Sequence, residues 1–100
     1  MKCSSYDLFF DAFSNKTRWK ILEALRFNDL SVNDICRITK EEQSKVSHNL
    51  KKLIECHFVE AVRKGKNKIY SLNKKTMTPL LELVEEHVNS YCGRVCLKIK

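Results

Sequence analysis

Side chains that can contact nucleic acid are concentrated between residues 43 and 68. Serine, glutamine and histidine can hydrogen-bond to base edges, whereas lysine and arginine place positive charge against phosphates. We interpret Ser44, Ser47 and His48 as candidates for base edges, although an ordinary solvated helix face has a similar composition. The full candidate set for DNA binding is Gln43, Ser44, Lys45, Ser47, His48, Lys51, Lys52, Arg63, Lys64, Lys66 and Lys68.

The excess positive charge is confined to the middle of the chain. The 100 residues carry a formal net charge of +7, and residues 37–75 hold eleven basic and four acidic side chains, which account for all of it. A confined basic segment favours a polyanionic partner, because each lysine or arginine placed at a phosphate releases condensed counterions. Charge alone would fit a merely solvated face equally well.

Five cysteines offer a second kind of chemistry. Cys92 and Cys96 are four residues apart, about 40° around a continuous helix, so two thiolates on one ridge could bind a soft metal such as zinc. Cys3, or a cysteine of a second chain, would complete that site. Thiol oxidation and incidental cysteines remain open alternatives, and no cofactor is required. Cys36 and Cys56 are expected to be packing residues, with reduced thiols as the default.

The polar residues 43–52 belong to a predicted helix that runs to about Cys56. Its apolar residues recur at the i, i+4, i+7, i+8 spacing of one buried helical stripe: Val46, Leu50, Leu53 and Ile54. Because the stripe faces the core, Ser44, Lys45, His48, Lys51 and Lys52 are expected to project from the opposite face of this helix.

Three further helices are predicted before this one. Two apolar helices begin at residues 4–5 and 14–15, and a short helix runs from Ser31, with Asp34 completing an approximate capping box, to about Ile38. A short helix, a tight turn and a helix with a polar N-terminal end are typical of a helix-turn-helix, whose second helix enters the major groove.

A β-hairpin is predicted directly after the polar helix. Residues 58–63 and 68–72 have strand composition, and Gly65 in the intervening turn permits a positive φ. The tip of this hairpin carries several positive charges, which do not stabilise the fold. Binding of an external anion is the simplest explanation for their presence. Arg63 to Lys68 are therefore expected at a neighbouring groove or the DNA backbone, and Lys45, Lys51 and Lys52 at phosphates.

Three segments together resemble the ArsR (arsenical-repressor) family of winged-helix regulators. They are FSNKTRWKIL at 13–22, QSKVSHNLKKL at 43–53, and RKGK at 63–66 with the following Tyr70 and Leu72. The resemblance covers roughly residues 7 to 72. It implies a mainly α fold with a small β-hairpin, a winged helix-turn-helix in the order α-α-α-α-β-β-α. We expect one DNA-binding domain over residues 1–100, in which 74–100 form a C-terminal dimerisation helix and tail.

The resemblance also implies a homodimer through the first and last helices, with both recognition helices reading an inverted repeat about 34 Å apart. The sequence agrees, because the last helix has a longer apolar stripe than a monomer of this size would readily cover. The candidate interface residues are Phe9, Phe10, Phe13, Leu80, Leu83, Val84, His87, Val88 and Tyr91.

Four departures from the family limit what the resemblance implies. Residues 31–33 are Ser-Val-Asn, where some metal-sensing members have Cys-x-Cys. The usual glycine between the two helices of the helix-turn-helix is identified as Thr39. His57 replaces the glycine after the recognition helix, so it is expected to strain its turn or adopt a positive φ. Glu42 replaces a capping serine and would weaken DNA affinity.

We therefore expect a sequence-specific DNA-binding transcriptional regulator, with repression as the family expectation and double-stranded DNA as its partner. The alternative is a winged-helix protein-interaction module. An enzyme is not expected, since no Gly-rich phosphate loop, Ser-His-Asp order or His-Glu-x-x-His motif occurs. Neither a stretch of about 20 apolar residues nor a signal-peptide core is present, so we expect a cytoplasmic protein without membrane contact.

Overall fold

The computed structural model describes residues 5–92, apart from the side chain of Cys92. Six of its elements are predicted from the sequence, namely the four helices before the hairpin and the two strands of the hairpin. A two-residue strand was not predicted. The elements are α1 (Tyr6–Ser14), α2 (Lys16–Leu25), β1 (Leu30–Ser31), α3 (Val32–Thr39), α4 (Gln43–Glu55), β2 (Val59–Lys64), β3 (Asn67–Leu72), α5 (Met77–His87) and a π-helix (Val88–Cys92).

The first three helices begin at polar side chains that cap them. Ser5 Oγ accepts a hydrogen bond from the Leu8 amide at 3.3 Å, and Asn15 Oδ1 accepts one from the Arg18 amide at 3.0 Å. Ser31 Oγ accepts from the Asp34 amide at 3.2 Å. Each cap satisfies an amide that has no partner inside its helix. The predicted starts of these helices are confirmed.

The hairpin is part of a three-stranded antiparallel sheet in the order β1-β3-β2. In β1, Leu30 pairs with Tyr70, and on the other side of β3 Leu72 pairs with Val59. Sequence analysis missed β1, because two residues are too few to show an alternating pattern. The consequence is that the loop before α3 is hydrogen-bonded to the hairpin.

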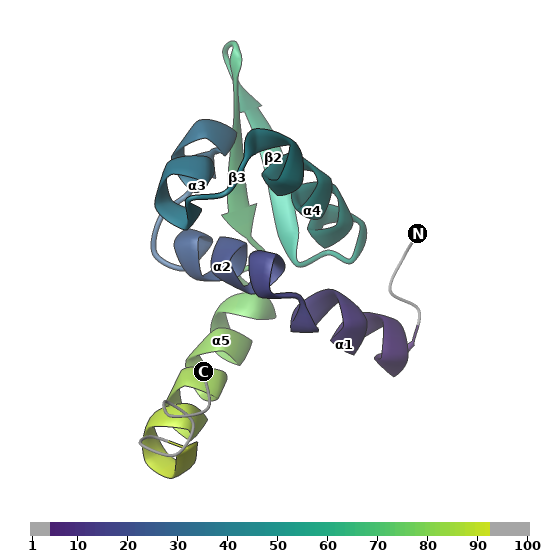
Figure 1. The fold of residues 1–100 in the computed structure, drawn as a ribbon, viewed down its shortest axis with the longest axis vertical. Coiled ribbons are helices and arrows are strands. Elements are labelled where there is room, and N and C mark those ends of the chain that lie inside the picture. The colour runs from purple at the N-terminus through teal and green to yellow at the C-terminus, as the bar shows by residue number, and fades with distance from the viewer. Residues whose placement is uncertain (1–4, 93–100) are drawn as a thin grey trace.

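A single apolar core lies where α2, α3 and α4 meet the base of the hairpin. Of the predicted stripe of α4, Val46, Leu50 and Leu53 are buried and Ile54 is half-buried. The stripe packs with the buried residues of α2, α3 and the hairpin region, which include Ile21, Leu22, Ile35, Phe58, Val59 and Leu72. In Figure 1 the three helices surround the lower part of the hairpin, whose tip extends beyond them. This arrangement is the predicted winged helix-turn-helix.

Helices α1 and α5 project from this body in different directions (Figure 1). Phe9 and Phe13 of α1 nevertheless contact their own chain, with ring centroids 5.1 and 6.0 Å from that of Phe58. Helix α5 is anchored by the buried Met77 and Leu81.

Other candidate interface residues on α1 and the C-terminal helix are turned to the outside. Phe10, Leu83 and Tyr91 are 60%, 63% and 79% exposed. Leu80, Val84 and Val88 are half-buried, and His87 is exposed, with its ring 5.0 Å from that of Tyr91.

The last helix differs from prediction in changing to a π-helix at Val88. The predicted ridge formed by Cys92 and Cys96 lies outside the described residues.

Candidate nucleic-acid interface

Helix α4 presents its polar residues on a face opposite the core. Val46, Asn49, Leu50 and Leu53 are its buried residues. All seven predicted contact residues on this helix are exposed, as the helical period requires: Gln43, Ser44, Lys45, Ser47, His48, Lys51 and Lys52.

The N-terminus of α4 carries two carboxylates. Glu42 is the N-cap residue, and its side chain makes no capping hydrogen bond, which leaves the first amides of α4 without that partner. Glu41 forms ion pairs with Lys20 of α2 at 3.1 Å and with Lys45 of α4 at 3.3 Å. Hydrogen bonds from Lys20 and Lys45 lower the pKa of Glu41 below its ordinary value, so this carboxylate is ionised at neutral pH.

Two non-glycine residues with positive φ end the helices of the helix-turn-helix. Lys40 has a φ of 59°, and its amide donates to the carbonyl of Cys36 at 2.8 Å. The predicted position, Thr39, is therefore wrong by one residue. Thr39 is the last residue of α3, and its hydroxyl donates to the Ile35 carbonyl at 2.7 Å. His57, with a φ of 62°, adopts the positive φ that the sequence predicts.

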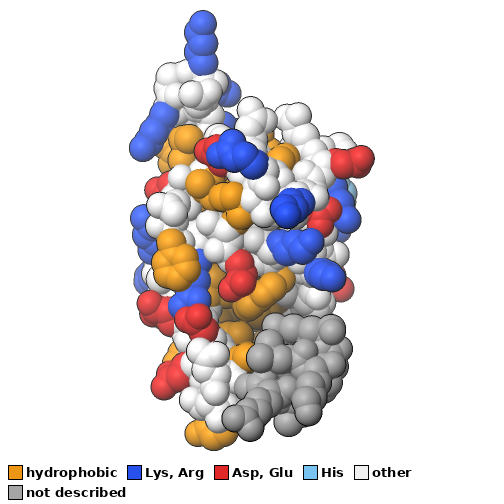
Figure 2. Space-filling view, turned by 60° about the vertical axis from the view of Figure 1, so that its left-hand side comes forward, with side chains coloured by type: hydrophobic (Ala, Val, Ile, Leu, Met, Phe, Trp, Pro, Cys, Tyr) orange, Lys and Arg blue, Asp and Glu red, His pale blue; other side chains and the backbone are white. Residues whose placement is uncertain are grey.

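The hairpin forms a tight basic wing. Its last pair is Lys64 with Asn67, which leaves Gly65 and Lys66 as a two-residue turn. Gly65 has a φ of 61° at the first turn position, where the II′ turn favoured by hairpins uses glycine. Arg63 lies directly opposite Lys68, a like-charge pair that opposes strand pairing. Figure 2 shows lysine and arginine side chains around the protruding tip.

Six cations of α4 and the wing have exposed, unopposed charges. Within residues 5–92 none of them forms an ion pair with a carboxylate, whereas Lys45 does. All six are exposed on the surface: Lys51, Lys52, Arg63, Lys64, Lys66 and Lys68. An arrangement of this kind binds a polyanion without first losing an internal salt bridge.

A buried arginine fixes α4 to the end of α1. Arg18 Nε donates to the Ala12 carbonyl at 2.6 Å, and Nη2 donates to the Asp11 carbonyl at 3.1 Å. Its Nη1 donates to Asn49 Oδ1 of α4 at 3.1 Å, and Asn49 Nδ2 donates to the Lys45 carbonyl at 2.9 Å. Sequence analysis did not identify this network, although an arginine and an asparagine inside otherwise apolar helical stripes were a usable signal.

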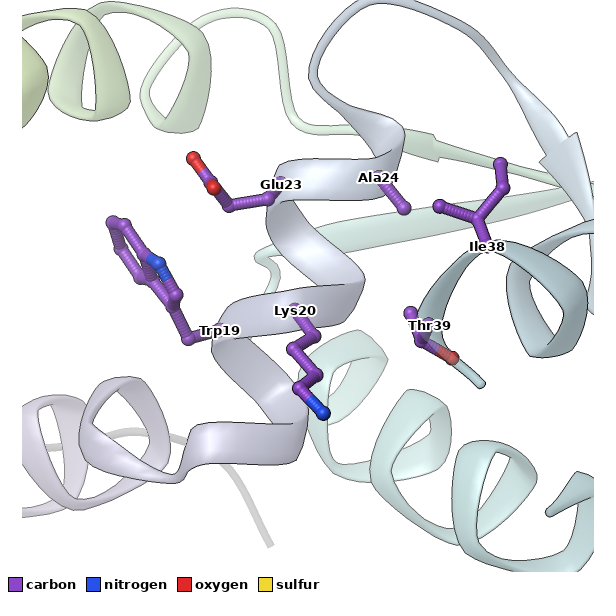
Figure 3. A pocket seen from close by; sticks show the side chains of 6 residues that line it. All are labelled: Trp19, Lys20, Glu23, Ala24, Ile38 and Thr39. Atoms are coloured by element: carbon purple, nitrogen blue, oxygen red, sulfur yellow. The ribbon is translucent and has the colours of Figure 1, made fainter. Parts of the chain in front are cut away.

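A groove of about 330 Å³ lies between α2 and α3 (Figure 3). Ala24 and Ile38 face each other across it, and Trp19 and Glu23 extend from the same side of α2. Lys20 also lines the groove and pairs with Glu41, so the groove adjoins the N-terminus of α4.

The predicted metal site falls outside what the structure describes. Cys3 and Cys96 lie outside the described residues, and so does the side chain of Cys92. Among residues 5–92, no group of three or more His, Cys, Asp or Glu side chains could hold a metal ion. Cys36 is a half-buried free thiol against the core, as expected. Cys56 is half-buried and also packs against the core, as expected.

Sequence comparison finds similarity to regulatory proteins. Residues 15–61 match the family described as "Bacterial regulatory protein, arsR family". The chain is 32% identical over 80 residues to the transcriptional repressor SmtB homolog of Synechocystis sp., covering 80% of this chain and 61% of that protein. It is 30% identical over 80 residues to the transcriptional repressor SdpR of Bacillus subtilis, covering 80% of this chain and 89% of that one.

Structural comparison gives the same fold. A homodimeric winged helix-turn-helix DNA-binding domain of a possible ArsR-family transcriptional regulator from Mycobacterium bovis superposes with a TM-score of 0.80 at 26% identity. The match covers 86% of this chain and 80% of that one. No helix within residues 5–92 is both long enough and apolar enough to cross a membrane.

Proposed function

The chain belongs to the ArsR family of bacterial regulatory proteins, whose members bind DNA and are not enzymes, and we propose that it represses transcription as a homodimer on an inverted-repeat operator. The observation that carries this proposal is the set of six exposed cations on α4 and the wing with no carboxylate partner in the described chain. Each can neutralise a DNA phosphate and release a counterion.

The two parts of the surface have different tasks in the proposed complex. Helix α4 enters the major groove, where its polar residues Gln43, Ser44, Ser47 and His48 reach base edges. Lys51 and Lys52 of the same helix reach phosphates. The wing contacts the backbone or a neighbouring groove through Arg63, Lys64, Lys66 and Lys68. The like-charge pair at the wing tip supports this role, because phosphates relieve a repulsion that folding alone does not.

The proposed dimer forms through α1 and the last helix. Both project from the body, and their exposed Phe10, Leu83 and Tyr91 offer apolar area that the described part of the chain does not bury. The similar domain from Mycobacterium bovis is homodimeric. Two-fold symmetry would place the recognition helices about one DNA turn apart, roughly 34 Å.

Fluorescence anisotropy tests the proposal directly. The labelled duplex carries the DNA immediately upstream of the protein's own gene, and a base-shuffled duplex of equal length is the control. We expect tighter binding to the native duplex, falling steeply with salt, and a loss with the double variant Lys51→Ala/Lys64→Ala. Equal, weak binding to both duplexes would contradict the proposal and favour a protein-interaction module.

The finer part of the proposal is that thiols at the C-terminal end sense a soft metal or an oxidant. Its basis is the sequence spacing of Cys92 and Cys96, with Cys3 as a further ligand. Replacing Cys92 and Cys96 with serine should leave DNA binding in metal-free, reducing buffer intact and remove the response to zinc or to peroxide. An unchanged response in that double variant would eliminate this sensor.

A further inference from the structure

We infer that Glu41 is a positioning residue that holds Lys45 away from DNA phosphates and thereby lowers the affinity of α4 for DNA. This inference rests on the proposed function and deepens it, because it concerns how the same surface is tuned.

The geometry engages both oxygens of one carboxylate. Glu41 Oε1 lies 3.3 Å from Lys45 Nζ, and Oε2 lies 3.1 Å from Lys20 Nζ. The Glu41 side chain is only 16% exposed, so water and salt screen its charge less than that of an open surface carboxylate. Glu41 lies just before the N-cap residue Glu42, and its carboxylate reaches Lys45 in the first turn of α4.

Lys45 differs in this respect from the other lysines of α4. Lys51 and Lys52 are exposed and have no carboxylate partner within the described part of the chain. A phosphate that approaches Lys45 must compete with Glu41 for the ammonium group. The same phosphate also meets the carboxylate charge beside a helix N-terminus, which would otherwise attract anions.

The number of phosphate contacts appears in the salt dependence of binding. Each contact contributes about 0.9 to the slope of log K against log salt concentration. Glu41→Gln removes the competing charge and should add about one contact, so the slope should steepen by about 0.9. The affinity gain of this variant over wild type should accordingly shrink about 3.5-fold between 50 and 200 mM salt.

A matched control lies one residue further on. Glu42→Gln removes an equal charge at the same helix end but releases no lysine, because Glu42 makes no ion pair among residues 5–92. We expect Glu42→Gln to raise affinity slightly with an unchanged slope. Lys45→Met should lower the slope less than Lys51→Met does. In Glu41→Gln/Lys45→Met the gain from Glu41→Gln should disappear.

The experiment measures anisotropy of the native upstream duplex and its shuffled control across a salt series, with circular dichroism to verify that each variant folds. Equal slopes for Glu41→Gln and Glu42→Gln would overturn the inference, as would a steeper slope that persists without Lys45. Failure of the proposed function looks different. In that case wild type does not distinguish the two duplexes, while the slopes on the shuffled duplex still decide the role of Glu41.

Discussion

Replacement of Arg18 by methionine should destabilise the fold severely, although this buried side chain is not part of the candidate DNA-binding surface. Arg18 is 7% exposed and Asn49 is 6% exposed, and three guanidinium nitrogens of Arg18 donate hydrogen bonds. Methionine fills much of the volume but leaves the Ala12 carbonyl and Asn49 Oδ1 buried without a donor. The Asp11 carbonyl belongs to an exposed residue and can be hydrated.

The magnitude follows from the two buried acceptors. Each unsatisfied buried acceptor costs about 1–3 kcal/mol, and relief of the buried positive charge offsets part of this cost. We expect a net loss of about 3 kcal/mol. For a domain of this size that loss lowers the Tm by roughly 12–24 °C.

Thermal unfolding followed by circular dichroism at a fixed protein concentration measures the effect. Arg37→Met is the matched control, because Arg37 is exposed and among residues 5–92 it forms an ion pair only with Asp34 on its own helix. The Tm of this variant should change little. The double variant Arg18→Met/Asn49→Leu removes donor and acceptor together and should be more stable than the sum of the single changes predicts. A Tm for Arg18→Met close to that of Arg37→Met would refute the reasoning.

Two further predictions concern backbone strain and acid. Lys40→Gly and His57→Gly should each raise the free energy of unfolding by about 0.5 kcal/mol in urea titrations, because relief of the left-handed φ exceeds the entropic cost of glycine; lower stability in both variants would contradict this. Hydrogen bonds from Ser31 and Arg37, from Lys20 and Lys45, and from Arg26 lower the pKa values of Asp34, Glu41 and Glu85 respectively. The stabilisation from these carboxylates is present above about pH 4.5 and is lost as the pH falls through their lowered pKa values. In the variant Asp34→Asn/Glu41→Gln/Glu85→Gln, the free energy of unfolding should therefore depend less on pH between about pH 5 and 3. An unchanged pH dependence would count against these three groups.

The features that sequence analysis predicted correctly are those with a local signal. The buried stripe of α4 repeats at helical spacing, the cap of α3 has its serine three residues before an acid, and the wing has glycine between two β-rich segments. The positive φ of His57 was expected from the resemblance, because His57 stands where the family usually has glycine after the recognition helix. The other residue with a positive φ is Lys40, one position after Thr39, which the sequence had matched to the usual glycine, since helix ends are poorly defined in sequence.

The features that sequence analysis missed depend on contacts between distant residues. Arg18 and Asn49 are 31 positions apart, and Lys20 and Glu41 are 21 apart. The sequences of α2 and α4 are those of ordinary amphipathic helices. The helical spacing of their apolar residues does not specify which polar residue of one helix contacts which polar residue of the other. Lys45 was consequently grouped with Lys51 and Lys52, although only Lys45 has a carboxylate partner within the described residues.

The short strand β1 divides the wing into a rigid base and an adaptable end. Ser31 pairs with Ile69 of the sheet and also caps α3, so the base of the wing and the start of the helix-turn-helix move as one unit. Beyond the pair of Val62 with Ile69, residues 63–68 are all exposed and contribute no buried side chain. The tip can therefore bend to follow a groove of variable width without disturbing the core, and DNA shape can be accommodated at the wing while α4 keeps its orientation.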